Sequence, residues 1–128
     1  MKAFIIDDDQ LSTFLTQSLL ELEGGAQEVS IFHSAHEALE ALRVAAAEHL
    51  PQVILLDLNM PIMDGWDFLE ALAPLEQKLI GKCHIYILTS SLDSADINCM
   101  KAYPVVSGLI QKPINSEDIE SVFKNKRY

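Results

Sequence analysis

Residues 53–65 read VILLDLNMPIMDG, and the interpretation of the whole chain starts from this stretch. Its first part, 53–58, is a nearly continuous apolar run of the kind found in strands that are buried on both faces. The run passes through Asp57, and a helical pattern then begins near Gly65 and continues over 65–72. A buried strand that ends in polar residues and leads into a helix is typical of a βαβ unit.

The same alternation of strand and helix continues in both directions along the chain. The pattern predicts four further strands, at 2–7, 28–32, 84–89 and 105–111. It predicts helices at 11–22, from Ser34, at 95–103 and from Ser116, and a polar connector at 75–82. Because strands alternate with helices throughout, we predict an α/β fold in which helices cover both faces of a parallel sheet.

Length and composition indicate one domain over residues 1–128. The chain is 49% hydrophobic and 22% charged, which is ordinary for a soluble domain with one core. Its formal net charge of −10 argues against binding to nucleic acid. No apolar run approaches the ~18 residues that a membrane span requires, and residues 1–10 do not read as a secretory signal. We therefore predict a cytoplasmic protein that makes no contact with a membrane.

Local patterns add three expectations about single side chains. Five apolar residues recur at helical spacing and predict an amphipathic helix with Asp9 as its N-cap: Leu11, Phe14, Leu15, Leu19 and Leu22. Cys83 and Cys99 have neither metal-site nor disulfide spacing, so we expect two buried thiols. His33 and His36 have metal-like spacing, but without a further ligand nearby we interpret them as a surface pair.

Polar side chains follow four of the predicted strands. They are Asp7 and Asp8 after the first, Asp57 at the end of the third, Thr89 and Ser90 after the fourth, and Lys112 and Pro113 after the fifth. Because the carboxyl ends of parallel strands meet at one edge of a sheet, we expect these groups to lie together. Clustered carboxylates repel one another unless a cation neutralises them, and oxygen ligands favour Mg²⁺ or Mn²⁺. The sequence therefore predicts a metal-dependent phosphoryl site with an aspartate as acceptor.

This set of residues resembles the signature of the receiver domains of two-component response regulators. The motifs occur in the family's order: Asp7-Asp8, Asp57, Met60-Pro61 with Asp64-Gly65, Thr89, and Lys112-Pro113. The resemblance extends over about residues 2–126 and implies a flavodoxin-like, doubly wound (βα)5 fold. The implied five-stranded parallel sheet has the order 2-1-3-4-5. No output domain follows in the sequence, so the resemblance implies a stand-alone receiver over residues 1–128.

The resemblance also implies how the acceptor and the metal would be held. Asp57 would be the phosphoacceptor. The metal, Mg²⁺ or Mn²⁺, would be bound by Asp7, Asp8, Asp57 and the backbone carbonyl of Asn59.

Further roles in the resemblance concern the phosphoryl group and the switch. Its oxygens would contact the Thr89 hydroxyl, the Ser90 backbone amide and Lys112, and the Lys112–Pro113 bond would be cis. Many receivers place an aromatic switch residue three positions before this lysine. That position is Leu109 here, which has no ring, so coupling through an aromatic rotamer is not expected.

The implied function is acceptance of a phosphoryl group from a sensor histidine kinase or histidine phosphotransfer protein. This modification would switch binding to a downstream protein target, and the chain would not be an enzyme. A phosphorylation-dependent homodimer stays open. The cognate kinase, the target, the pathway and the phosphoryl lifetime also stay open, as does the choice among messenger, relay intermediate and phosphate sink.

Three alternatives compete with this function. A haloacid-dehalogenase-type phosphatase needs a second acid two residues after its nucleophile, where this chain has Asn59. A flavodoxin-type cofactor site would place a phosphate at residues 7–10, DDDQ, whose acids would repel it. The third alternative is a receiver-like interaction module that is never phosphorylated, and the complete set of site residues argues against it.

Overall fold

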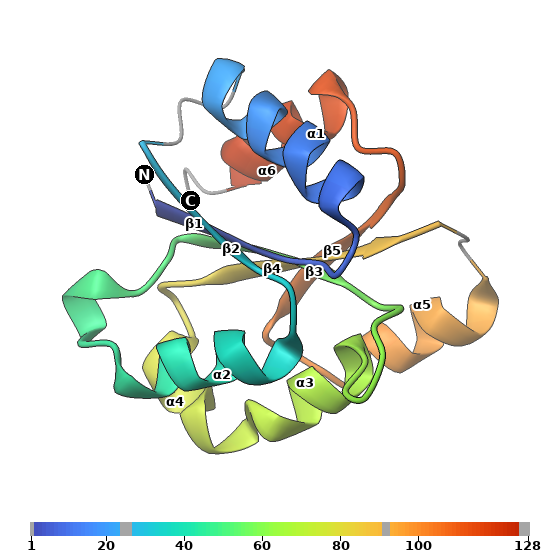
Figure 1. The fold of residues 1–128 in the computed structure, drawn as a ribbon. Coiled ribbons are helices and arrows are strands. Elements are labelled where there is room, and N and C mark those ends of the chain that lie inside the picture. The colour runs from blue at the N-terminus through green and yellow to red at the C-terminus, as the bar shows by residue number, and fades with distance from the viewer. Residues whose placement is uncertain (1, 24–26, 91–92, 126–128) are drawn as a thin grey trace.

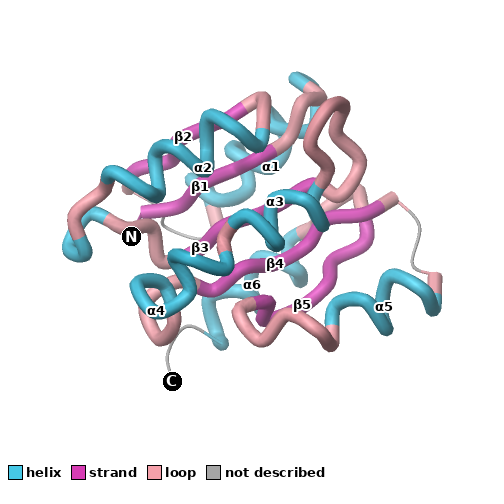
Figure 2. Tube along the Cα trace, turned by 90° about the horizontal axis from the view of Figure 1, so that it is seen from below, coloured by secondary structure: helices cyan, strands magenta, loops and turns pink. Residues whose placement is uncertain are grey.

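A computed structural model of the chain describes residues 2–23, 27–90 and 93–125. Within them, five parallel strands form one sheet in the order β2-β1-β3-β4-β5, as expected. Figure 2 shows this sheet in magenta. The strands are β1 (Lys2–Ile6), β2 (Glu28–Phe32), β3 (Val53–Asp57), β4 (His84–Thr89) and β5 (Val106–Gln111).

Six α-helices in the described residues cover the two faces of the sheet. They are α1 (Gln10–Leu22), α2 (Ala35–Val44), α3 (Gly65–Ala71), α4 (Glu76–Leu79), α5 (Ser94–Met100) and α6 (Ser116–Asn125). Helices α1 and α6 lie on one face, and α2, α3, α4 and α5 lie on the other (Figure 1). Over the described ranges, no helix combines the length and the apolar character that crossing a membrane would require. The flavodoxin-like α/β fold is confirmed.

Strand β3 lies at the centre of the sheet, between β1 and β4, and all five of its residues are buried. Its side chains alternate between two apolar clusters. Ile54 and Leu56 join the cluster beneath α2 and α3, whereas Leu55 joins the cluster beneath α1 and α6. Burial of each such side chain stabilises the fold by roughly 1.5–3 kcal/mol. The sheet therefore rests on the apolar run that the sequence indicated.

The loop after β3 turns back tightly at Gly65. A Cβ atom on this residue would lie 2.8 Å from Leu58 Cδ2 and 3.0 Å from the backbone oxygen of Asp57. The Asp64 carboxylate caps α3 by accepting the Asp67 amide, and Asp67 accepts the Asp64 amide in return. The close approach and the reciprocal cap position α3 directly beside the end of β3.

Helix α1 forms where predicted, but most of the apolar residues in its pattern face solvent. Leu22 is 84% exposed and Phe14 63% exposed, and Leu11 and Leu15 are also exposed. The residues that α1 buries are Thr13, Thr16 and Leu20. The first turn is anchored at Asp7, which accepts hydrogen bonds from the Asp9 amide and the Ser12 hydroxyl. We attribute the rotation of the helix to this polar anchor, which periodicity does not reveal.

Two further expectations were wrong. Residues 75–82 are not a polar connector, because a 3-10 turn (Ala73–Leu75) leads into α4, where Leu79 is wholly buried. Cys99 is exposed rather than buried, because α5 buries none of its own residues. Cys83 is buried as expected, and its thiol donates to the Pro51 carbonyl at 2.8 Å.

Candidate functional site

Adjacent strands bring the predicted acids together. Ile6 of β1 pairs with Leu56 of β3, so the residues that follow them meet at one edge of the sheet. Asp7, Asp8 and Asp57 each offer a carboxylate oxygen, and these oxygens lie within 4.8 Å of one another. Asp7 and Asp57 are buried and Asp8 is exposed. The edge thus concentrates negative charge at the boundary between the core and solvent.

Lys112 brings a positive charge to this cluster from the end of β5. Its Nζ lies 2.8 Å from Asp7 Oδ2 and 3.2 Å from Asp57 Oδ1. The resemblance implies that Lys112 contacts a phosphoryl group on Asp57, and in the structure its ammonium lies near Asp57 and closer still to Asp7. The Lys112 backbone amide donates to the Thr89 carbonyl at 2.7 Å, and the Lys112–Pro113 peptide bond is cis.

The charges in the cluster shift the pKa values of two groups. Burial raises the pKa of Asp57 to about 6, the charge of Asp7 raises it further, and Lys112 opposes both effects. Burial by itself lowers the pKa of Lys112, but its hydrogen bond and charge interaction with Asp7 and its contact with Asp57 raise it on balance. The Lys112 ammonium contacts two of the three carboxylates, so its single positive charge does not balance the negative charge of the cluster.

The remaining predicted residues lie on the loop after β3 and on or after β4 and β5. The Asn59 amide donates to Asp57 Oδ1 at 3.4 Å, and Asn59 itself is exposed. Thr89 is buried at the end of β4, the strand that pairs with β3, and Ser90 follows it at the surface. Leu109 lies on β5 opposite Ile87 and packs against the core.

Sequence reasoning missed two contacts to Asp7. Ser12 Oγ donates to Asp7 Oδ2 at 2.8 Å, from the first turn of α1. His33 Nδ1 lies 3.1 Å from the Asp7 backbone oxygen, although the side chain is exposed, as expected of a surface histidine. The spacing between Asp7 and Ser12 was a usable signal, because a hydroxyl in the first turn of a helix can face back toward the strand that precedes it.

The donor set fits a hard divalent cation. Asp7, Asp8 and Asp57 supply carboxylate oxygens, and the Asn59 carbonyl adds a neutral oxygen close to them in the sequence. Mg²⁺ is commonly held by one or two carboxylates while it keeps several waters, and Mn²⁺ accepts the same ligands. The exposure of Asp8 leaves such waters a route into the cluster.

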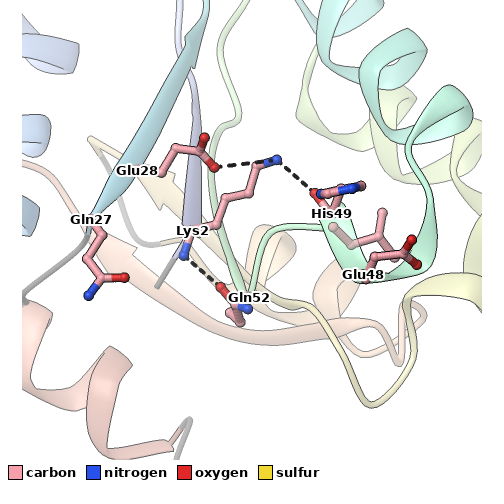
Figure 3. Close-up of a pocket in the computed structure, with 7 residues that line it drawn as sticks. Lys2, Gln27, Glu28, Glu48, His49 and Gln52 are labelled. Atoms are coloured by element: carbon pink, nitrogen blue, oxygen red, sulfur yellow. Dashed lines mark hydrogen bonds and ion pairs between the residues drawn. The ribbon is translucent and has the colours of Figure 1, made fainter.

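A hollow lies at the other end of the strands, away from the acidic cluster (Figure 3). It has a volume of about 260 Å³ and is formed around Lys2, at the start of β1. Lys2 Nζ donates to the His49 carbonyl and lies 3.6 Å from Glu28, while the Lys2 amide donates to the Gln52 side chain. These polar groups engage one another, so we interpret this hollow as structural.

Comparison with protein families shows which family the chain belongs to. A family model described as the response regulator receiver domain matches residues 3–124. The chain belongs to this family. Receiver domains are parts of two-component signalling proteins.

Solved structures of receivers share the whole fold. A response regulator receiver protein from Dyadobacter fermentans is 30% identical, with a TM-score of 0.86 over 99% of this chain and 98% of the other. A two-component response regulator from Cytophaga hutchinsonii is 25% identical, with a TM-score of 0.88 over 98% of this chain and 96% of the other.

Among curated proteins, the receiver domain matches part of a longer protein. Protein-glutamate methylesterase/protein-glutamine glutaminase 1 of Paramagnetospirillum magneticum is 29% identical over 119 residues. The match covers 93% of this chain but only 29% of that protein. The similarity therefore concerns the receiver region, and the activities in that name are stated of that protein.

Proposed function

We propose that this receiver accepts a phosphoryl group on Asp57 from a histidine kinase or histidine phosphotransfer protein. One observation carries the proposal: Asp7, Asp8 and Asp57 converge within 4.8 Å, and Lys112 Nζ lies 3.2 Å from Asp57. In this geometry one carboxylate can act as the nucleophile, while the other two would hold a divalent cation that, with the ammonium, offsets the charge of the incoming group.

Asp57 supplies the attacking oxygen in this reaction. We assign the attack to Oδ2, because Lys112 and the Asn59 amide hold Oδ1. The bond from Oδ2 to phosphorus forms as the phosphorus–nitrogen bond of the donor phosphohistidine breaks. The electron pair of the broken bond leaves with the imidazole, which then takes up a proton.

The other groups at the site would bind the metal ion or the phosphoryl oxygens. Asp7 and Asp8, with Asp57 and the Asn59 carbonyl, would hold Mg²⁺ or Mn²⁺. When bound, this ion would neutralise the charge that develops on the phosphoryl oxygens. Lys112 and two groups from the end of β4, the hydroxyl of Thr89 and the amide of Ser90, would bind the oxygens of the new ester.

The output of this chemistry is a change in protein binding. Aspartyl phosphate adds negative charge to a pocket that is already acidic, so the groups that face it must rearrange. We propose that Thr89 and the segment after it pass this change to the face formed by α5, β5 and α6. Leu109 supplies no ring, so we assign the coupling to Thr89 and not to an aromatic rotamer. The partner of this face is a downstream protein or a second copy of the chain.

The test is phosphorylation by a small donor. The protein is incubated with acetyl phosphate or phosphoramidate, with Mg²⁺ or with a chelator, and its intact mass is measured over time. We expect a labile gain of one phosphoryl group that requires the metal and is absent from Asp57→Asn. Asp9→Asn is the matched control, because Asp9 caps α1 through its side chain and asparagine preserves such a cap.

Each alternative has its own result in this experiment. No gain in mass with either donor would favour an interaction module that is never phosphorylated. A gain that persists in Asp57→Asn would place the acceptor elsewhere. Steady turnover of phosphoesters would favour a phosphatase.

A further inference from the structure

The Asp7 carboxylate, which is fully buried, is held by three hydrogen bonds. Its Oδ1 accepts from the Asp9 amide at 3.0 Å. Its Oδ2 accepts from two donors, Ser12 Oγ and Lys112 Nζ, each at 2.8 Å. Two of these donors belong to the first turn of α1 or the residue before it, and the third comes from the end of β5. The carboxylate is thus fixed in one orientation by elements that are far apart in the sequence.

The two carboxylate oxygens of Asp7 differ in how many further hydrogen bonds or ligand contacts they can accept. A carboxylate oxygen offers about two lone-pair positions. Among the residues that the structure describes, Ser12 and Lys112 occupy both positions of Oδ2, whereas Oδ1 carries one recorded bond. By this count Oδ1 keeps a lone-pair position for a further ligand, whereas both positions of Oδ2 are taken by the two donors. Ser12 therefore helps to decide which oxygen of Asp7 can reach a cation.

Lys112 is shared between Asp7 and the proposed phosphoacceptor. Its Nζ lies 2.8 Å from Asp7 Oδ2 and 3.2 Å from Asp57 Oδ1. Phosphoryl oxygens on Asp57 would attract this ammonium, and any movement of Nζ toward them weakens its bond to Asp7. A buried carboxylate oxygen that loses all of its donors is strongly destabilised. Ser12 supplies the donor that stays.

From these contacts we propose that Ser12 is a positioning residue for phosphoryl transfer. Its hydroxyl holds the Asp7 carboxylate in the orientation that binds the cation, and it keeps Asp7 Oδ2 hydrogen-bonded when Lys112 moves to the phosphoryl group. Ser12 touches neither phosphorus nor Asp57 in this scheme and acts through Asp7. The inference rests on the proposed function for its second half, whereas its first half concerns cation binding alone.

The test compares Ser12→Ala with Ser12→Thr, which keeps the hydroxyl. The affinity for Mg²⁺ is measured by calorimetric titration, and the phosphorylation rate with acetyl phosphate is measured by intact mass at saturating Mg²⁺. We expect Ser12→Ala to bind Mg²⁺ about tenfold more weakly and to be phosphorylated several-fold more slowly, the size expected for one hydrogen bond to a charged group. Ser12→Thr is expected to stay within about threefold of the natural protein in both measurements.

Ser18→Ala is the matched control. Ser18 lies on the same helix, and its hydroxyl donates to the Phe14 carbonyl, away from the acidic cluster. A pair of larger variants, Ser12→Thr and Ser12→Val, repeats the comparison at nearly constant volume in case Ser12→Ala does not fold. Circular dichroism of every variant separates loss of the fold from loss of the hydroxyl.

Two results would overturn the inference. Mg²⁺ affinity and phosphorylation in Ser12→Ala that match the natural protein would show that Asp7 is positioned without Ser12. Equal losses in Ser12→Ala and Ser12→Thr would show that position 12 acts through packing rather than through its hydroxyl. If the natural protein itself takes up no phosphoryl group, the proposed function fails, and the Mg²⁺ titration still decides whether Ser12 orients Asp7.

Discussion

The charged form of the Asp57 carboxyl group is destabilised by burial and by the neighbouring Asp7. Burial and the nearby charge of Asp7 raise its pKa to about 6, while Lys112 lowers it. An acid whose pKa is raised on folding binds its proton more tightly in the folded state than in the unfolded state. The contribution of Asp57 to the free energy of unfolding therefore falls as the pH rises from about 4 to about 6, and this loss is complete above that window.

Asp57→Asn is expected to stabilise the protein in the absence of a divalent cation. At pH 7.5 the gain in free energy of unfolding should be about 1–3 kcal/mol, because the variant has no buried charge to form at this position. The gain should shrink through pH 6 and vanish near pH 4. Urea denaturation in chelator at several pH values measures it, with Asp9→Asn as control. A gain that is constant from pH 4 to pH 8 would contradict the assigned pKa.

The two cysteines should differ sharply in reactivity. Cys83 is buried, burial raises the pKa of its thiol to about 11, and the thiol donates to the Pro51 carbonyl. Cys99 is exposed on α5. Because the thiolate is the reactive form, iodoacetamide at pH 8 should modify Cys99 in the folded protein and leave Cys83 unmodified. Peptide mass mapping checks this, with Cys99→Ser as the control. Early modification of Cys83 would contradict its burial just before β4.

At the scale of the element, α1 separates what periodicity can and cannot predict. The helical spacing of its apolar residues indicated the helix correctly, and Asp9 caps it as expected. The same spacing misidentified the buried face: Thr13, Thr16 and Leu20 point inward, and the first turn is hydrogen-bonded to Asp7. A hydrophobic pattern ranks residues by their apolar character, whereas a polar contact to another element can set the rotation of a helix.

Leucines on opposite faces of α1 should therefore contribute unequally to stability. Leu20 has no exposed surface, whereas Leu22 is 84% exposed. Leu20→Ala should lower the free energy of unfolding by about 2–5 kcal/mol, because it leaves a cavity in the core. Leu22→Ala should change it by no more than about 0.5 kcal/mol. Urea denaturation of the two variants measures both free energies of unfolding. Similar losses in the two variants would contradict the burial of Leu20 and the exposure of Leu22.

At the scale of the whole molecule, stability is distributed unevenly between the centre of the sheet and α5. The strands β1, β3 and β4 are enclosed by helices on both faces, and β3 is buried throughout (Figure 1). Helix α5 buries none of its residues. Its carboxyl end is followed by Tyr103, which stacks on Trp66 with ring centroids 5.7 Å apart and donates to Glu70 at 2.8 Å. Among the described residues, the segment after α5 is thus anchored by Tyr103, whereas α5 itself contributes no buried residue.

Hydrogen exchange should reproduce this distribution. Amides of β3 should exchange only through global unfolding, whereas amides of α5 should exchange through local opening at a rate at least about a hundredfold higher. Helix α2, which buries Ala35, Ala38 and Leu42, serves as the control and should be intermediate. Exchange measured by mass spectrometry tests the order. Equal protection of α5 and β3 would contradict an unevenly held α5.

The sequence by itself determined the order of strands and helices, the family resemblance and the acids at the strand ends. These features depend on short apolar runs, which the sequence shows at 53–58 and in the other strands, and on the rule that the carboxyl ends of parallel strands meet at one edge of the sheet. Tertiary structure alone decided the rotation of α1, the exposure of Cys99, the helix within 75–82 and the contact of Ser12 with Asp7. Each depends on which side chain a distant element presents, and local sequence spacing does not encode that choice.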